Sequence, residues 1–397
     1  MYQSVRMLDM HPEIVIVGAG IIGSSIAYHL ARKGARNILV LERDAASDPN
    51  QPAPDLSVRA SCARATGGFR VQYGTLVNVR LSMMARAELL EFAELTEVDA
   101  GYEPCGYLFL AQDASQLEGL QQALTVQRSA GLEVSRIVTP QEIHALNPAL
   151  SLTGIAGASY CPWDGFVRPL AMRRGYQQAA EQMGVRFRFG CEVSLERSAD
   201  GVRVVCDGER LSAGAVINAA GAWAAALMRG ANLELPVTPV KRQIAATVST
   251  QVLPSDMPMS IFAGDGFHLR VRDGRVLLLM PFDFDAQDLT YDPAWLPALL
   301  ARTHARVPAL RDVPIETGWA GLYEVSPDGH ALLGRHWDAQ NLYLANGSSG
   351  HGVMHSPALG KLLSEIVLDG RAHSLDVHSL RPERFLEGQP IIGNSLL

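Results

Sequence analysis

The chain has 397 residues, of which 48% are hydrophobic and 19% are charged, and its net charge is −7 at pH 7. This length exceeds what one small hydrophobic core holds, so we expect two domains. The acidic balance argues against a nucleic-acid partner. The five cysteines are scattered and form no C-x-x-C pair, which argues against a disulfide framework and a zinc site. The first residues contain no apolar signal-peptide core, and a cytoplasmic location is expected.

A glycine-rich motif follows the first apolar run. Ile14 to Val17 is expected to form a buried parallel strand, and Gly18, Gly20 and Gly23 then give the spacing G-x-G-x-x-G. Glu42 ends the next apolar run. In dinucleotide-binding folds such glycines allow a tight turn, approach of the pyrophosphate and close helix packing, while the acid accepts hydrogen bonds from ribose hydroxyls. The motif predicts a bound dinucleotide, and alone it does not distinguish FAD from NAD.

Helices and strands are predicted along the middle of the chain. One helix is expected over about residues 79–95. Thr139 and Glu142 have the spacing of a capping box, so a second helix is expected to begin there. A third helix is expected over about residues 169–183, before a strand that ends near Val193.

Glycine and proline mark three other features. The proline-rich residues 44–57 are expected to form an exposed loop. Residues 211–228 include no charged residue over 18 positions, but their glycines favour a buried strand, a turn and a helix over a membrane span. Alternating residues on both sides of Asp273 and Gly274 predict a β-hairpin.

Three later motifs complete the pattern. Residues 215–223 read as a second strand with a glycine turn, residues 318–334 contain the run GLYEVSPDG, and residues 346–361 form a glycine-rich entrance to a helix. With the first motif, and in this order, they resemble the FAD-dependent D-amino-acid oxidase superfamily. The similarity is greatest to its sarcosine oxidase, glycine oxidase and proline dehydrogenase β-subunit branch. It spans roughly residues 13–375 and implies FAD as the cofactor.

The resemblance and the α/β pattern at both ends predict an α/β protein with two domains. A Rossmann-like FAD-binding domain is interrupted by an α+β substrate domain that is built on a mostly antiparallel sheet. The FAD-binding domain is assigned residues 12–100, 151–235 and 311–375, the substrate domain residues 101–150 and 236–310, and a C-terminal extension residues 376–397.

The resemblance also implies how FAD binds. Binding is expected to be noncovalent, because Gly321 stands where many relatives carry the cysteine that tethers the flavin. The glycines at 347, 350 and 352 are expected to let the backbone and the helix N-terminus approach the ring, where they stabilise its negative charge on reduction. The implied cofactor-binding residues are Gly18, Gly20, Ile22, Gly23, Glu42, Arg43, Ser61, Cys62, Thr66, Gly67, Val193, Ala220, Gly221, Trp223, Gly321, Ser349, Gly350, His351, Gly352, Val353 and Met354.

Five side chains are expected on the substrate side. Arg70 matches the arginine that pairs with the substrate carboxylate in sarcosine oxidases, with a surface or FAD-phosphate ion pair as the alternative. Tyr323 matches a substrate-side tyrosine, with a core aromatic as the alternative, and His351 is expected to touch the flavin. His268 and Arg270 alternate on one strand and share a face, which is either the cavity or a solvated surface. No metal site is predicted.

Two departures from the family pattern bear on the reaction. Met354 replaces a lysine that helps to hold the carboxylate in monomeric sarcosine oxidases, which makes sarcosine a less favoured substrate. Lys33, Lys241 and Lys361 all lie outside residues 280–288, which match the region of the oxygen-activating lysine. The sequence thus favours a dehydrogenase, which passes electrons to a carrier or a partner subunit, over an oxidase that uses oxygen.

The sequence therefore predicts an enzyme that oxidises the C–N bond of a sarcosine-, glycine- or proline-like amino acid or secondary amine by hydride transfer to flavin N5. Two alternatives stay open. One is an FAD-dependent 2-hydroxy-acid dehydrogenase with the same fold, and the other is a flavin-containing assembly subunit with no turnover of its own.

Overall fold

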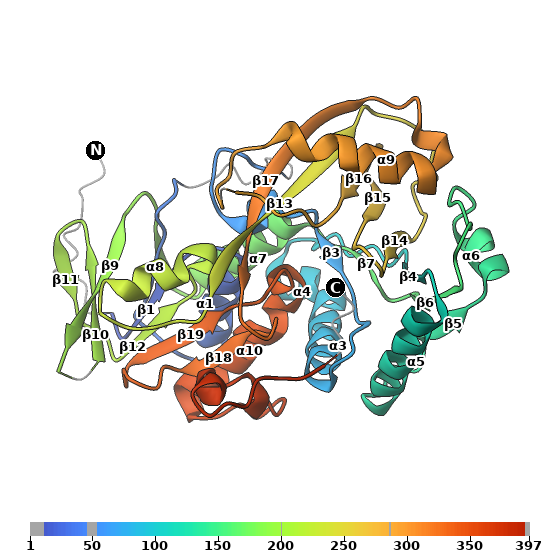
Figure 1. Cartoon of the computed structure of the whole chain (residues 1–397). Helices are drawn as coiled ribbons and strands as arrows, with labels where there is room; N and C mark the ends of the chain where they lie inside the picture. The colour runs from blue at the N-terminus through green and yellow to red at the C-terminus, as the bar shows by residue number, and fades with distance from the viewer. Residues whose placement is uncertain (1–11, 46–53, 200, 286, 394–397) are drawn as a thin grey trace.

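The computed structural model describes residues 12–45, 54–199, 201–285 and 287–393. Most of the loop expected over residues 44–57 and the last four residues of the C-terminal extension lie outside these ranges. Figure 1 shows a central α/β region with a small sheet on one side and a large sheet, with its own helices, on the other.

A six-stranded sheet forms the centre of the α/β region. Its order is β18-β19-β12-β1-β2-β8, and every neighbouring pair is parallel except β18 with β19. Its strands are β1 (Ile14–Val17), β2 (Ile38–Leu41), β8 (Arg186–Arg188), β12 (Ala215–Asn218), β18 (Leu332–Arg335) and β19 (Leu342–Asn346). The middle four are buried at every position, as parallel strands covered on both faces require.

Helices cover one face of this sheet, and a small sheet and a helix cover the other. Along β1, Ile14 and Ile16 pack into the helical core, whereas Val15 and Val17 pack into the opposite core, as the two-residue period of a strand dictates. The helices of the first face are α1 (Ile21–Arg32), α3 (Leu76–Leu90), α7 (Pro169–Gln182) and α10 (Gly352–Asp369). The second face is covered by β9 (Val193–Ser198), β10 (Gly201–Cys206), β11 (Glu209–Leu211) and α8 (Ala224–Arg229).

The large sheet has eight strands and is antiparallel at every neighbouring pair except β14 with β4, as the sequence predicted in outline. In order across the sheet its strands are β17 (Ile315–Val325), β13 (Thr238–Thr247), β16 (Arg275–Leu279), β15 (His268–Arg272), β14 (Met259–Phe262), β4 (Tyr107–Ala111), β6 (Gly157–Cys161) and β5 (Arg136–Val138). Trp295 is fully buried between this sheet and α9 (Leu296–Arg306). The sheet's other helices are α5 (Ala114–Ser129) and α6 (Pro140–Leu146).

Two strands of the large sheet come from ranges that we assigned to the FAD-binding domain. β6 pairs antiparallel with β4, with Cys161 opposite Tyr107. β17 pairs antiparallel with β13, with Val325 opposite Thr238. Both pairings are long-range, so no local sequence pattern reveals them. The division into domains stays a prediction, and these two strands belong structurally with the larger sheet.

Several local predictions are confirmed and two need correction. The capping box is present, with the Thr139 N–H donating to Glu142 at 2.8 Å, and the hairpin turn has positive φ angles of 51° at Asp273 and 72° at Gly274. The helix expected over residues 79–95 is wrong in its bounds: α3 begins at Leu76, and after it ends at Leu90 a separate α4 (Phe92–Thr96) follows. Val193 begins β9 instead of ending the preceding strand.

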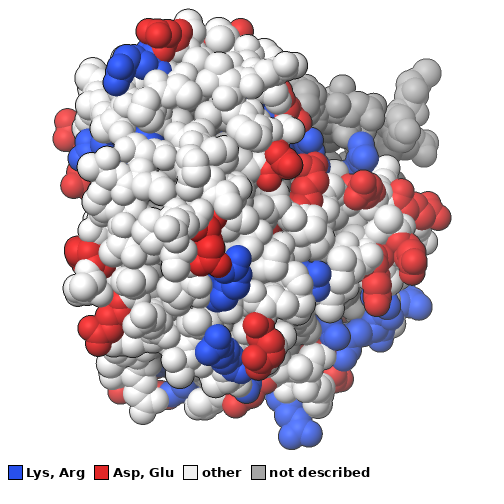
Figure 2. All heavy atoms as spheres, turned by 90° about the vertical axis from the view of Figure 1, so that its right-hand side faces the viewer, with Lys and Arg blue, Asp and Glu red and all other residues white. Residues whose placement is uncertain are grey.

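Residues 211–228 contain β12, a glycine turn and α8, as expected. Within the described ranges, no helix has both the length and the apolar character needed to cross a bilayer. On the face shown in Figure 2, acidic and basic side chains are interspersed over a largely uncharged surface. The short elements that remain are α2 (Ser61–Arg64), β3 (Gly68–Phe69), β7 (Gly165–Phe166), and 3-10 turns at Gly221–Trp223, Pro293–Trp295, Pro308–Leu310, His378–Leu380 and Pro382–Phe385.

Candidate active site

A cavity of about 750 Å³ runs from the edge of the six-stranded sheet to the eight-stranded sheet. Every residue predicted to bind cofactor or substrate lines it except Gly23. A Cβ at Gly23 would lie 1.9 Å from the Gly18 carbonyl oxygen, so this glycine serves the close packing of α1 against the turn. The fold therefore brings together residues that are as far apart in the sequence as Gly18 and Met354.

The nucleotide end of the cavity has the features of a pyrophosphate site. Gly18 has a φ of 108°, and a Cβ there would lie 2.4 Å from the Ala219 carbonyl oxygen. Gly20, in contrast, faces open space with nothing within 4 Å of a Cβ position, directly before the first turn of α1. The Glu42 carboxylate accepts hydrogen bonds from the Ala19 N–H at 2.8 Å and the Asp44 N–H at 2.9 Å. It is thus held in place beside the glycine turn.

Two glycines near the start of α10 are required by contacts within the protein itself. A Cβ at Gly350 would lie 2.4 Å from the Tyr323 ring, and a Cβ at Gly347 would lie 2.5 Å from Leu332. Both residues also have positive φ angles, of 91° and 68°. The lack of a side chain is therefore required by the protein's own packing and turn geometry. Gly350 lines the cavity and Gly347 does not, and the approach of the flavin ring to this loop stays a prediction. The cavity nevertheless meets the first turn of α10 at Gly352.

Arg70 lies buried at the other end of the cavity, with 5% of its surface exposed. Its guanidinium carbon lies 4.3 Å from the centre of the Tyr73 ring, and one of its nitrogens lies 2.9 Å from His351 Nε2. Because a guanidinium only donates, Nε2 accepts and the ring carries its proton on Nδ1. Burial and the Arg70 charge lower the pKa of His351 well below its ordinary value. His351 is therefore neutral at pH 7.

His268 and Arg270 both face the cavity, which excludes the solvated alternative for that side of β15. His268 Nδ1 lies 2.8 Å from the Gly266 carbonyl oxygen, so Nδ1 donates and Nε2 is left as an acceptor. Burial lowers the pKa of His268 to about 4. Arg270 donates to the carbonyl oxygen and the hydroxyl of Thr66.

Tyr323 is 39% exposed and lines the cavity, so it is not the core aromatic of the alternative interpretation. The guanidinium carbon of Arg242 lies 5.6 Å from its ring centre. Met354 also lies on the cavity wall. Its sulfur accepts a hydrogen bond from the Tyr73 hydroxyl at 2.9 Å. Tyr73 thus packs against both Arg70 and Met354.

Three residues of the site were missed by the sequence analysis. Tyr107 is buried on the cavity wall, and burial raises the pKa of Glu324, also on the wall, to about 7. Asp164 accepts hydrogen bonds from the Val71 N–H and the Gln72 side chain next to Arg70, and burial raises its pKa to about 7. Tyr107 and Glu324 stand in strand patterns without a local signal. Asp164, in the turn sequence PWDGF, was the one that a motif could have indicated.

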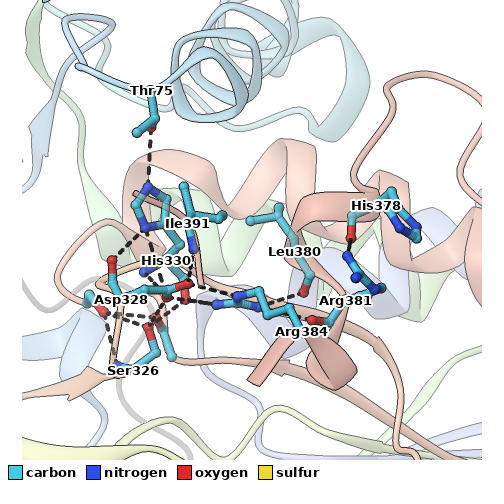
Figure 3. A network of polar contacts seen from close by, with 11 residues as sticks. Thr75, Ser326, Asp328, His330, His378, Leu380, Arg381, Arg384 and Ile391 are labelled. Carbon is cyan, nitrogen blue, oxygen red and sulfur yellow. Dashed lines mark hydrogen bonds and ion pairs between the residues drawn. The ribbon is translucent and has the colours of Figure 1, made fainter. Parts of the chain in front are cut away.

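Polar contacts join the C-terminal extension to Asp328 and His330 (Figure 3). Arg384 is fully buried and donates two hydrogen bonds to Asp328, at 2.8 and 2.9 Å. The neighbouring His330 lies 2.7 Å from the Asp328 carbonyl oxygen through Nδ1 and 3.3 Å from the Thr75 hydroxyl through Nε2. Asp328, His330, Thr75 and Gly393 line the cavity. The extension is therefore a structural part of the site.

Comparison with known proteins gives the family. The model of the family described as FAD dependent oxidoreductase (DAO) matches residues 13–366. The chain is 28% identical to FAD-dependent oxidoreductase domain-containing protein 1 of Xenopus laevis, covering 98% of this chain and 86% of that one. It is 24% identical to glycine oxidase of Bacillus licheniformis, covering 94% and 97%. Its fold matches L-proline dehydrogenase from P. horikoshii with a TM-score of 0.86 at 26% identity, covering 96% and 99%. These matches confirm the resemblance that the four motifs indicated: the protein belongs to the D-amino-acid oxidase (DAO) family of FAD-dependent oxidoreductases.

Proposed function

We propose that the protein oxidises the C–N bond of an amino acid or secondary amine that carries a carboxylate, with noncovalently bound FAD. The observation that carries this proposal is one cavity with two different ends: a glycine turn with Glu42 at one, and buried Arg70 with neutral histidines at the other. Bound FAD supplies a two-electron acceptor for the substrate hydride. Glycine oxidase of Bacillus licheniformis and dimethylglycine dehydrogenase of Rattus norvegicus, both relatives, have names that fit such substrates.

The residues present fit the cofactor. The backbone at Gly20 and the N-terminus of α1 would hold the pyrophosphate, and Glu42 would accept from the ribose hydroxyls. The N-terminus of α10 would stabilise negative charge at the flavin end. Gly321 offers no nucleophile, and burial raises the pKa of Cys62 on the cavity wall, so its thiol stays protonated. Acid precipitation should therefore leave all of the yellow colour in the supernatant.

The substrate end can orient an amino acid without a strong base. Arg70 can hold a carboxylate through two parallel N–H donors. His268 Nε2 is free to accept a hydrogen bond from the substrate amine, because Nδ1 donates to Gly266. The positive charges of Arg70 and Arg270 disfavour an ammonium ion beside them, so the amine loses its proton to water before it reacts. Correct placement of the α-carbon then supplies much of the rate.

The acceptor of the electrons is proposed to be a carrier or a partner subunit. Among the described residues that line the cavity there is no lysine. Lys241 is buried on β13, and its amino group forms an ion pair with Asp288 at 2.8 Å, away from the cavity wall. A cytoplasmic location belongs to the same proposal, in line with five free cysteines.

Anaerobic titration of the purified yellow protein tests the proposal. Glycine, sarcosine, proline and other carboxylate-bearing amines are added in turn, and loss of visible flavin absorbance is recorded together with the released amine, ammonia and oxoacid. Bleaching by amines supports C–N oxidation. Bleaching by 2-hydroxy acids alone would assign the hydroxy-acid dehydrogenase instead. Flavin absorbance that persists with every compound would indicate a flavin-containing subunit without turnover.

A further inference from the structure

A second buried guanidinium faces the cavity, and its charge is not balanced by the protein. Arg270 is only 2% exposed, and its guanidinium carbon lies 5.0 Å from the centre of the Phe166 ring. Its hydrogen bonds go to the uncharged oxygens of Thr66, and its Nε atom has no partner among the described residues. No carboxylate in the described part of the chain lies within ion-pair distance of it. A buried charge in this state is strongly unfavourable unless a ligand supplies the counter-ion.

A second unsatisfied donor lies beside Arg270. Tyr107 on β4 is 2% exposed, and its hydroxyl has no hydrogen-bond partner among the described residues. A Cβ placed on Gly68 would lie 2.5 Å from the Tyr107 hydroxyl and 3.2 Å from an Arg270 nitrogen. The Tyr107 hydroxyl and the Nη1 nitrogen of Arg270, which also donates to the Thr66 carbonyl oxygen, therefore lie at the same point of the cavity wall, and a larger residue at 68 would obstruct them. A guanidinium with a neighbouring hydroxyl is a donor set that suits a carboxylate.

The amine acceptor lines the same cavity as the two guanidinium groups. His268 and Arg270 lie on the same face of β15, two residues apart. After the larger effect of burial, the charges of Arg270, Arg70 and Arg242 all lower the pKa of His268. A substrate amine bonded to His268 would thus lie in a cavity that holds both Arg70 and Arg270.

We propose that Arg270 and Tyr107 form a second carboxylate subsite, and that the substrate is a secondary amine with a carboxylate on each arm, an iminodicarboxylate. Arg70 receives one carboxylate, Arg270 and Tyr107 receive the other, and His268 accepts from the amine between them. The inference rests on the proposed function, which gives Arg70 its carboxylate. A monocarboxylate such as glycine would leave Arg270 buried without a counter-ion, and so binds more weakly.

Binding of inert analogues to the FAD-loaded protein tests this subsite without turnover. Thiodiacetate has two carboxylates around a sulfur, and methylthioacetate has one. Affinity is measured by titration calorimetry and by the change in the flavin spectrum. Thiodiacetate is expected to bind at least about tenfold more tightly than methylthioacetate, because its second carboxylate gains one hydrogen-bonded ion pair. Equal affinities would overturn the proposal.

Two variants and one control locate the effect. Arg270→Met should weaken the binding of thiodiacetate by about 10- to 100-fold and that of methylthioacetate by much less. Tyr107→Phe should weaken the binding of thiodiacetate by roughly 2- to 10-fold. Arg272→Met is the matched control: this arginine lies two residues further along β15, donates to the Val167 carbonyl oxygen and does not line the cavity. It should leave both affinities unchanged.

Failure of this inference can be told apart from failure of the proposed function. If glycine or sarcosine reduces the flavin with a higher kcat/KM than iminodiacetate does, the dicarboxylate class is wrong and C–N oxidation stands. If Arg270→Met loses FAD, Arg270 serves the cofactor and the subsite is wrong. If Arg270→Met does not fold, Tyr107→Phe decides: unchanged thiodiacetate affinity contradicts the proposal. If no amine bleaches the bound flavin, the proposed function itself fails.

Discussion

At the scale of single residues, Arg70 is held in place by ring contacts. The Tyr73 ring lies 4.3 Å from the guanidinium carbon, and neutral His351 accepts a hydrogen bond from the guanidinium at 2.9 Å. Such contacts fix the orientation of the guanidinium. The group is thereby prepared for an anionic ligand, and the side chain need not rearrange when the ligand arrives.

Arg70→Met should lower kcat/KM for carboxylate-bearing amines by roughly 10- to 100-fold, because it removes hydrogen bonds between charged groups. FAD content should stay at the wild-type level. Steady-state kinetics and the flavin-to-protein absorbance ratio measure the two quantities. Arg86→Met is the control, since Arg86 stacks on Trp163 at 4.1 Å and does not line the cavity. Unchanged kinetics in Arg70→Met would remove this residue from the substrate site.

The buried carboxyl group of Glu324 should make the stability of the protein depend on pH. Burial raises its pKa to about 7, and one of its carboxylate oxygens has no partner among the described residues. Between about pH 5 and pH 7 the unfolded carboxyl is ionised while the folded one keeps its proton, so the folded state binds more protons. This group therefore lowers the free energy of unfolding as the pH rises through that window.

Glu324→Gln removes this titration and keeps a hydrogen-bonding side chain of the same size. Relative to wild type, the variant should gain about 2–3 kcal/mol more in unfolding free energy at pH 8 than at pH 5. Denaturant unfolding of both proteins at the two pH values gives the difference. An advantage that is the same at both values would show that the carboxyl is ionised throughout.

At the scale of elements, the C-terminal extension acts through one buried ion pair. Arg384 and Asp328 are both almost completely buried, and Asp328 in turn accepts from the Ile391 N–H at 3.0 Å. Burial alone would raise the pKa of Asp328, but the hydrogen bonds from Arg384 outweigh it and hold this pKa at about 2. The pair joins the extension to the loop that carries His330 at the cavity wall.

Arg384→Met should lower the free energy of unfolding by about 3–5 kcal/mol, because it leaves a buried carboxylate without its partner. Arg381→Met is the matched control from the same segment: its ion pair with Glu387 is exposed, and its loss should cost less than about 1 kcal/mol. In wild type the contribution of Asp328 is present above about pH 4 and disappears as the pH falls toward 2. Equal losses in the two variants would contradict the role of the pair.

The helices and strands around the cavity differ in how well the sequence predicts them. The turn from β1 to α1 is local, and its glycine spacing is enough to place Gly18, Gly20 and Glu42 at one end of the cavity. The substrate end is assembled from β3, β4, β15, β17 and the start of α10, which are distant in the sequence. Tyr107 could not be found there, because its position in an apolar strand looks the same whether the strand faces a core or a cavity. The family resemblance supplied Arg70, for which the local pattern offers no signal.

At the scale of the whole molecule, the two sheets place the cavity between a nucleotide end and a substrate end, and the charges on its wall bear on the choice of electron acceptor. Reduction of oxygen builds up negative charge, which a cation beside the reaction site would stabilise. Arg70, Arg242 and Arg270 line the substrate end, and a bound carboxylate product offsets part of their positive charge. Lys241, the buried lysine of the large sheet, is already paired with Asp288.

We therefore expect the reduced protein with product bound to pass electrons to an artificial dye at least about tenfold faster than to oxygen at equal concentration. Stopped-flow mixing of anaerobically reduced protein with dye or with air-saturated buffer measures both rates, and a faster reaction with oxygen would assign an oxidase.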